Sequence, residues 1–483
     1  MLKSNLLEIL ATLNLKEFKD FGEYVNSPFF NKNEAVIKLY EYIRRYFPAL
    51  EGLNFGKENV FSEIFPNAEY NDGFMRTIMF NLTKLAEDYI AYKDFKSREL
   101  TEQIHLLKAL NKRDLNRLFS KNLKLASEKL EKNRIHDEFY FNEKFLIEYE
   151  KNINDFKSIK ILNQKDIPEG DITNQSEYLI NYFILQLLKR YRTLLNLKNV
   201  LDIDFDRPLM AELLQYIESH PEIYSEIPLA GLLYNEIKLL ETDDKDYYNS
   251  IKELVLDMNT GFDRSERFNG LVVISNYCLK KNHEGNRSAL EDFMEISEFM
   301  FENKIDTLNK GDYLQINYFR TVLLMALTAG RVDWAERFVK ESKDALSPEE
   351  RENAYNFAMA RLEFSRRNFE RSLKFLSLVR YDDIYYKFSG KTLQAQLYYE
   401  LDMLNELSDH LDSYRKFLNN SKLLTGLHKK VNENFVKVMN DLLKLKSNSG
   451  RTKISKLKEK ITTYKELSGK SWLLNKLEEL EKS

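Results

Sequence analysis

The 483-residue chain has few of the residues that cross-link or interrupt helices: one cysteine, eight prolines and fifteen glycines. The lone cysteine, Cys278, excludes an internal disulfide, and its apolar setting in "VVISNYCLKK" predicts a buried core thiol. Scarce proline and glycine, set against abundant Leu, Lys and Glu, favour long helices joined by short turns. The composition therefore predicts an all-α protein.

Long apolar runs are also missing, since none approaches the ~18 to 20 residues that a bilayer-spanning helix needs. Near the N-terminus, Glu8 interrupts the apolar residues of "MLKSNLLEILATLNLKEF", and no small-residue cleavage site follows. Neither a secretory signal nor a membrane anchor is expected. We predict a cytoplasmic protein without a membrane partner.

The chain as a whole has no large excess of either charge, with 73 Lys and Arg against 76 Asp and Glu and a formal net charge of -3. Bulk attraction to nucleic acid is therefore not expected. Two segments are locally basic: residues 421–483, with 15 Lys and Arg against 7 acids, and "LLKRYRTLLNLK", with Lys189, Arg190 and Arg192. Such charge either contacts phosphates or coats the outer faces of packed helices, and the alternating signs favour the second interpretation.

Motifs for catalysis, cofactors and metals are absent from the sequence as well. "GKT" at 390–392 and "GKS" at 469–471 resemble the end of a phosphate-binding loop, but Tyr385 and Tyr464 replace the upstream glycine and no strand is expected before them. The six histidines have no second ligand at metal-binding spacing. We therefore predict a protein that is not an enzyme and holds no cofactor or metal.

An acidic stretch at 202–213, "DIDFDRPLMAEL", has the alternating aspartates of a calcium loop, of which Asp206 is the last. Arg207, however, stands where the loop needs glycine, and Leu213 where it needs a bidentate glutamate. We interpret the stretch as a helix N-terminus capped by Asp206, with Pro208 in the first turn.

Residues 1–97 contain several short segments with apolar residues at helical spacing. In one of them, Phe18, Phe21 and Val25 fall on the same face. The expected helices are 3–12, 15–26, 34–47, a short one ended by Pro66, and 72–93. Together they predict an N-terminal helical bundle.

Within that bundle, "EYVNSPFFNKNEAV" (23–36) places two phenylalanines beside a Ser-Pro. Proline disfavours helical geometry in the residue before it, so the first helix is expected to stop near Asn26. Asn31 is expected to cap the next helix. Phe29 and Phe30 are predicted to plug the corner between the two helices, the alternative being an exposed recognition motif.

Residues 98–228 are predicted to connect the bundle to the rest of the chain through further helices, among them 115–132, 137–152 and 175–199. Between the last two lies "KDIPEGDITN". Because Pro168 and Gly170 both favour turns, this cluster is the strongest internal boundary signal.

From about 229 to 446 the pattern changes to helices of about 12 to 20 residues that alternate with turns of two to five. Three of these turns recur in phase. The helices after them are expected to begin at Val332, Phe369 and Met403, which are 37 and 34 residues apart. Such spacing predicts helical hairpins stacked in a row.

This spacing resembles the tetratricopeptide repeat, a helix-turn-helix hairpin of about 34 residues. The second helix of that repeat carries a small residue three positions after the aromatic residue that follows the turn. Ala335 after Val332 and Ser372 after Phe369 supply the small residue, whereas Glu406 after Met403 departs from the pattern.

The resemblance, which covers about residues 229–420, implies a right-handed α-solenoid whose first helices line a concave groove. Polar residues on those helices that packing does not need become contact candidates. They are Asn317, Arg320, Asn356, Glu363, Gln394 and Tyr398. We therefore expect a scaffold or adaptor that binds a protein or peptide.

Two alternatives stay open. The layout also resembles that of bacterial regulators that pair a small helical domain with such repeats, which implies a nucleic-acid-associated regulator with a local basic patch. After the polar linker "KSNSGRTK", residues 451–483 are expected to form helices that either cap the solenoid or bind a partner. The sequence indicates neither the partner nor the oligomeric state.

Overall fold

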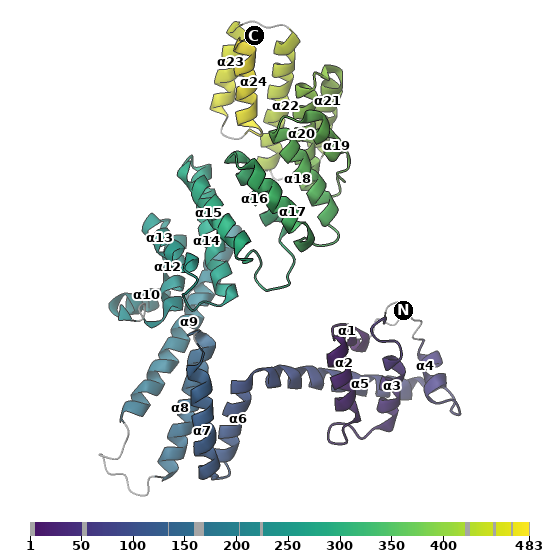
Figure 1. Cartoon of the computed structure of the whole chain (residues 1–483), viewed down its shortest axis with the longest axis vertical. Coiled ribbons are helices and arrows are strands. Elements are labelled where there is room, and N and C mark those ends of the chain that lie inside the picture. The colour runs from purple at the N-terminus through teal and green to yellow at the C-terminus, as the bar shows by residue number, and fades with distance from the viewer. Residues whose placement is uncertain are drawn as a thin grey trace. The chain divides into compact units, whose positions relative to one another are not determined.

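The computed structural model describes residues 5–50, 56–133, 135–158, 169–201, 203–222, 226–420, 426–447, 451–464 and 467–482. The regular secondary structure of these residues is entirely helical, which confirms the predicted all-α class. None of the described helices is both long and apolar enough to cross a bilayer. The chain divides into two compact units, Met1–Leu187 and Leu188–Ser483, which are described in turn (Figure 1).

The first unit begins with a bundle formed by α1 (Asn5–Ala11), α2 (Leu15–Asn26), α3 (Glu34–Arg44), α4 (Lys57–Ile64) and α5 (Asp72–Ser97). The long helix α5 contacts each of the others and closes their shared core. Two phenol groups tie the helices together: Tyr40 donates to the backbone oxygen of Phe18 (3.1 Å), and Tyr89 donates to that of Glu17 (2.9 Å). The bundle thus buries both rings with their hydroxyls satisfied.

Asparagines hold the loop between α2 and α3, but with a different division of roles than predicted. Helix α2 ends at Asn26, as expected. Asn33 rather than Asn31 caps α3, because the Asn33 side chain accepts from the backbone N–H of Ala35 at 3.0 Å. The Asn31 side chain instead donates to the backbone oxygen of Val25 at 3.0 Å and fastens the loop to the end of α2.

The two phenylalanines of this loop do not plug the corner between the helices, so that prediction is wrong. Phe29 is 86% exposed and Phe30 is 40% exposed, whereas Phe21 and Tyr40 are buried in the interior. Phe30 stacks on Tyr24 with 4.0 Å between ring centroids, and Phe29 lies edge-on to Phe30 at 4.9 Å. The pair forms an exposed aromatic corner.

Replacing Phe29 with serine is expected to change the free energy of unfolding by less than about 0.5 kcal/mol, as for other exposed positions. The same substitution at the buried Phe21 is expected to cost several times more. Thermal unfolding of both variants, followed by circular dichroism, measures the difference. A loss above about 1 kcal/mol for Phe29→Ser would mean that this ring packs in the folded state.

Three further helices complete most of the first unit: α6 (Glu99–Asn111), α7 (Asn116–Glu131) and α8 (Glu138–Ser158). Each contacts the other two. At their centre, the buried Asn111 side chain donates to the Glu150 carboxylate (2.8 Å) and accepts from the Asn154 amide (2.9 Å). This polar network satisfies groups that would otherwise destabilise the helix junction.

Helix α9 (Glu169–Leu201) connects the two units. It begins at Glu169, so Gly170 lies inside a helix and not in the boundary that was predicted around Pro168. Pro168 itself lies outside the described residues. The division between the units falls after Leu187, within α9.

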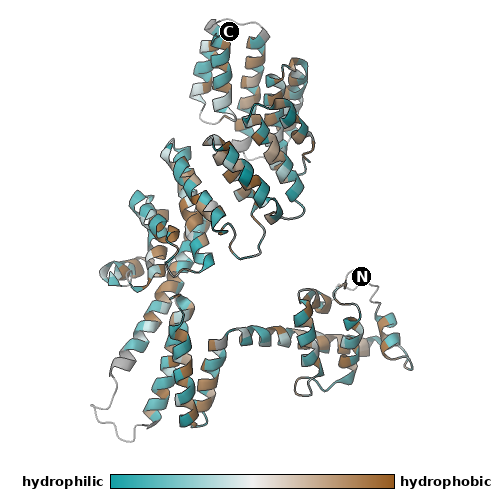
Figure 2. Ribbon diagram, viewed as in Figure 1, coloured by the Kyte–Doolittle hydropathy of each residue, from teal (hydrophilic) through white to brown (hydrophobic). Residues whose placement is uncertain are grey.

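The second unit continues with α10 (Met210–Ser219), α12 (Pro228–Thr242), α13 (Lys245–Leu256), α14 (Arg264–His283), α15 (Ser288–Glu302), α16 (Ile316–Thr328), α17 (Val332–Ser342), α18 (Arg351–Ser365), α19 (Phe369–Ser377), α20 (Ile384–Glu400), α21 (Leu404–Asn420), α22 (Gly426–Ser447), α23 (Arg451–Thr463) and α24 (Lys470–Lys482). From α12 onward each helix contacts the next. Alternate helices also contact one another in the pairs α12 with α14, α16 with α18, α18 with α20 and α20 with α22. Most of these helices carry both hydrophobic and hydrophilic residues, as expected of elements packed on one side (Figure 2).

The turns inside three of these hairpins share one backbone geometry. Gly330, Arg367 and Asp402 have φ angles of 74°, 63° and 59°. In each turn the next residue donates its N–H to a carbonyl five residues earlier, at 2.9 Å, which is the bond of a Schellman motif. Helices α17 and α19 begin where predicted, and α21 begins at Leu404, one residue after the predicted Met403.

The single cysteine lies in the core of the second unit, as predicted. Cys278 of α14 is 1% exposed, and its Sγ donates to the hydroxyl of Tyr248 on α13 at 3.4 Å. Burial raises the pKa of the thiol to about 11. Reactive cysteines have lowered pKa values, so this one is a packing residue.

The last helices pack onto the hairpins before them. Ile461 of α23 and Leu477 of α24 are fully buried in a core that includes Phe435 of α22. The indole of Trp472 donates to the Glu400 carboxylate of α20 at 2.7 Å. Burial of this kind is what the capping alternative expects.

Candidate functional site

Arg320 of α16 is the centre of a cluster that joins α16 to the start of α20. Its Nη2 donates to Asp383 Oδ2 at 2.7 Å. The guanidinium carbon lies 4.1 Å from the ring centroid of Tyr385 and 4.4 Å from that of Tyr386. Its side chain is only 10% exposed, and Nε has no hydrogen-bond partner within the described part of the chain. The ion pair and the two ring contacts thus fix the Arg320 guanidinium in place, and its Nε–H remains available as a hydrogen-bond donor.

A second guanidinium, Arg361 of α18, comes close to the same aromatic group and was not predicted from the sequence. Its carbon lies 6.0 Å from the ring centroid of Phe357, one turn earlier, and it interacts electrostatically with Tyr385. Burial lowers the pKa of Arg361 from its usual value. Among the described residues, no carboxylate pairs with it. Its side chain is partly exposed, so a carboxylate of a ligand can reach it and supply the missing counter-ion.

Asn317 and Leu324 belong to the same stripe of α16 as Arg320, because positions three and four residues apart are neighbours on a helix. Both side chains are exposed, Leu324 at 41%. We call Asn317, Arg320, Leu324, Arg361 and Tyr385 the Arg320 surface. They come from α16, α18 and α20, which contact one another in that order. The structure thus brings together the predicted Asn317 and Arg320 and adds three residues to them.

The other predicted contact residues lie elsewhere on these helices. Glu363 is 1% exposed, and its carboxylate accepts from a side-chain amide of the turn after α18 at 2.9 Å. Gln394 donates to the Tyr398 hydroxyl at 2.7 Å, and the Tyr398 ring lies edge-on to a histidine of α21. Asn356 is half-buried and makes no hydrogen bond through its amide to the described residues.

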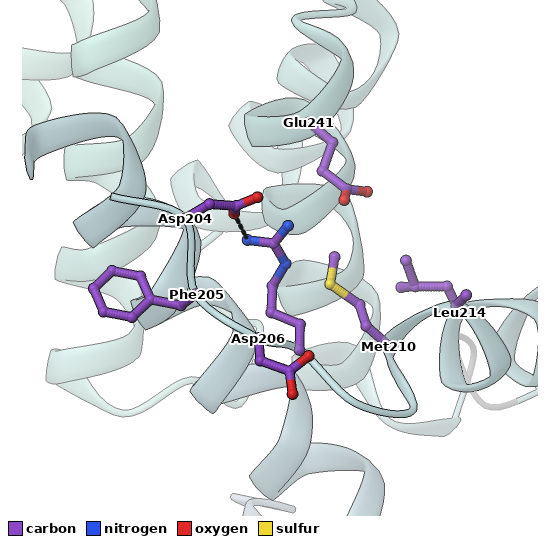
Figure 3. Close-up of a pocket in the computed structure, with 8 residues that line it drawn as sticks. Asp204, Phe205, Asp206, Met210, Leu214 and Glu241 are labelled. Carbon is purple, nitrogen blue, oxygen red and sulfur yellow. Dashed lines mark hydrogen bonds and ion pairs between the residues drawn. The ribbon is translucent and has the colours of Figure 1, made fainter. Parts of the chain in front are cut away.

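A pocket of about 540 Å³ lies beside α10 and α12 (Figure 3). Its lining is Asp204, Phe205, Asp206, Arg207, Met210, Ala211, Leu214 and Glu241. Arg207 Nη1 bonds to Asp204 Oδ1 at 3.0 Å, and a hydrogen bond from Lys198 holds the pKa of Asp204 below its usual value. The described lining offers carboxylates and one guanidinium but no thiol, hydroxyl or imidazole.

The same region corrects the predicted start of α10. The helix begins at Met210, and Leu209, with a φ of 64°, occupies the cap position without a side-chain hydrogen bond. Asp206 therefore lines the pocket and does not cap the helix. In the described part of the chain, no group of three or more His, Cys, Asp or Glu side chains is placed to hold a metal ion.

Two of the three cations in the basic segment of α9 are held in ion pairs. Arg192 is 8% exposed, and its Nη1 bonds to Glu236 Oε2 (3.1 Å) and Glu266 Oε2 (2.8 Å). Lys189 bonds to the other oxygen of Glu266 at 2.7 Å. Because both cations face carboxylates of α12 and α14, they are not free to contact phosphate.

Glu236 is the least well compensated member of this ion cluster. It is fully buried, its Oε1 accepts no hydrogen bond from the described residues, and it shares Arg192 with Glu266. Burial raises the pKa of Glu236 to about 7, although the neighbouring guanidinium opposes the shift. The cluster therefore contains a carboxylate that titrates near neutral pH.

Comparison with known proteins yields no relative, since no family model, curated protein or solved structure matches the chain. Of the surfaces described above, the Arg320 surface is the one with an arginine, Arg361, that pairs with no described carboxylate.

Proposed function

We propose that this protein is a cytoplasmic, non-catalytic interaction scaffold that binds an acidic peptide, or an acidic loop of a protein, on the Arg320 surface. The second unit would form a right-handed α-solenoid of tetratricopeptide-like hairpins, and the Arg320 surface would belong to its groove. Repeated Schellman turns and contacts between alternate helices support this arrangement.

The observation that carries the proposal is the unpaired guanidinium of Arg361. Arg320 has Asp383 as a counter-ion, whereas Arg361 has none among the described residues. A carboxylate from a partner would pair with Arg361 through charge-assisted hydrogen bonds. The exposed Leu324 and the ring of Tyr385 would contact the apolar parts of the same peptide.

Selection from a displayed library of random peptides on the full-length chain is expected to enrich peptides rich in Asp and Glu. Arg361→Gln is expected to weaken binding of the best peptide about ten- to a hundredfold, because a hydrogen bond between charged groups contributes about 1.5 to 3 kcal/mol. Fluorescence anisotropy with the labelled peptide measures both dissociation constants.

Arg415→Gln is the matched control, since it removes the same charge from an exposed residue of α21 that pairs with Asp412 at 3.3 Å. Its affinity is expected to equal that of the unaltered chain. The Arg361 side chain is partly exposed and pairs with no described carboxylate, so the variant is not expected to lower stability. Enrichment without acidic residues, or equal binding by the Arg361 variant, would overturn the proposal.

A further inference from the structure

Residues of α22 and α23 line a second pocket, which is open to solvent and has a volume of about 330 Å³. Four lysines line it: Lys444 from α22, and Lys453, Lys456 and Lys460 from α23. Its single acidic lining residue is Asp441, which bonds to Lys460 at 2.8 Å. The other three ammonium groups form no ion pair with any described residue, so the pocket is strongly electropositive.

Three of the four lysines lie on the same face of α23. Lys453, Lys456 and Lys460 follow at steps of three and four residues, so they share one face of α23 over a rise of about 10 Å. Lys444 approaches from the neighbouring helix. The buried side chains of Leu445 and Leu457 form the apolar part of the lining.

The charge pattern of α23 also runs against the usual preference of helices. Its first turn contains Lys453 and no acidic residue. A helix N-terminus carries a partial positive charge, and a cation there is unfavourable by a few tenths of a kcal/mol or more. A bound anion would offset both the repulsion among the lysines and this unfavourable placement.

We propose that this pocket binds a compact polyanion carrying several phosphate groups, either free or as the phosphate chain of a nucleotide. Lysine ammonium groups donate to phosphate oxygens as point charges and need no planar geometry. Several lysines spread over about 10 Å of helix axis match a ligand with closely spaced negative charges better than a single carboxylate. None of the described lining residues is aromatic, so we expect no preference for a base.

Isothermal titration calorimetry of the full-length chain with inorganic tripolyphosphate tests the site. Saturable binding is expected, with an affinity that falls as salt is raised. The double variant Lys453→Gln/Lys456→Gln is expected to bind at least about tenfold more weakly, since two charge-assisted contacts are lost. Both side chains are exposed, so the variant is expected to fold.

Lys416→Gln/Lys437→Gln is the control, because it removes the same charge from exposed lysines of α21 and α22 that do not line the pocket. ATP is expected to bind as tightly as tripolyphosphate within a few-fold. Absence of saturable binding, or equal weakening in the control, would overturn the site. So would binding of a single-stranded oligonucleotide through the same lysines without binding of tripolyphosphate, which would favour nucleic-acid contact instead.

Discussion

Replacing Arg192 with leucine is expected to destabilise the second unit by about 3 to 5 kcal/mol. The substitution leaves Glu236 and Glu266 without the guanidinium that both of them contact. Lys189 still reaches Glu266, but no other described cation reaches Glu236. A buried carboxylate without a counter-ion either pays the desolvation penalty or takes up a proton.

Hydrogen exchange of the full-length chain, followed by mass spectrometry, measures this effect locally. Peptides from α12 and α14 are expected to exchange faster in Arg192→Leu, whereas peptides from the N-terminal bundle serve as an internal reference and are expected to keep their rates. Unchanged protection of α12 would show that the ion cluster contributes little to stability.

The same cluster predicts how stability depends on pH. The pKa of Glu236 is about 7 in the folded protein, against an ordinary value of 4.5. Between these two values the folded state binds more protons than the unfolded state, so this group's contribution to stability falls as pH rises through the window and levels off above it. In Glu236→Gln this contribution is absent. As pH rises from 5 to 8, the free energy of unfolding of the variant is expected to increase relative to that of the unaltered chain by on the order of 2 to 3 kcal/mol. Thermal unfolding across that range measures the gain, and parallel pH profiles would contradict the assignment.

The second large loss of stability is expected when Gly22 of α2 is replaced with alanine. An alanine Cβ there would lie 2.2 Å from the hydroxyl oxygen of Tyr40 and 2.7 Å from the ring carbon that carries it. Tyr40 is 1% exposed and is fixed by its hydrogen bond to Phe18, so it has no space to retreat. Gly22→Ala is therefore expected to cost about 3 kcal/mol, at the upper end for overpacked cores.

A double-mutant cycle separates this clash from a general effect of the substitution. Tyr40→Phe removes the atom nearest to the added Cβ, so the cost of Gly22→Ala is expected to be smaller in that background. Gly73→Ala, where the nearest atom is a side-chain oxygen at 3.3 Å, is the control and is expected to be nearly neutral. Equal costs in both backgrounds would rule out the clash as the cause.

Helix positions were well predicted wherever apolar spacing and a turn signal agree. The end of α2 at Asn26 follows from the Ser-Pro beyond it, and the starts of α17 and α19 follow from repeated turns. These signals depend only on residues that are close together in the chain, so they can be recognised from the sequence alone. Phe29 shows where such reasoning fails, because burial depends on whether the interior still has room for the ring.

The candidate sites were predicted less well, because they depend on which helix face meets which neighbour. Glu363 seemed free on its helix, but its carboxylate belongs to the turn that follows. Arg361 gave no signal at all, since a lone arginine near an aromatic residue is common in helices. Its significance comes from Tyr385, which lies more than twenty residues away in the chain. The lysine pocket likewise needs two helices to be seen together.

The buried thiol of Cys278 can be used to measure local opening of the second unit. With its pKa raised to about 11 and 1% of its surface exposed, it is expected to react with an alkylating reagent only after local opening around α14. The rate of alkylation therefore reports how often this part of the structure opens. Because the chain has no other cysteine, a fluorophore can be attached to an introduced surface cysteine without first removing the native one.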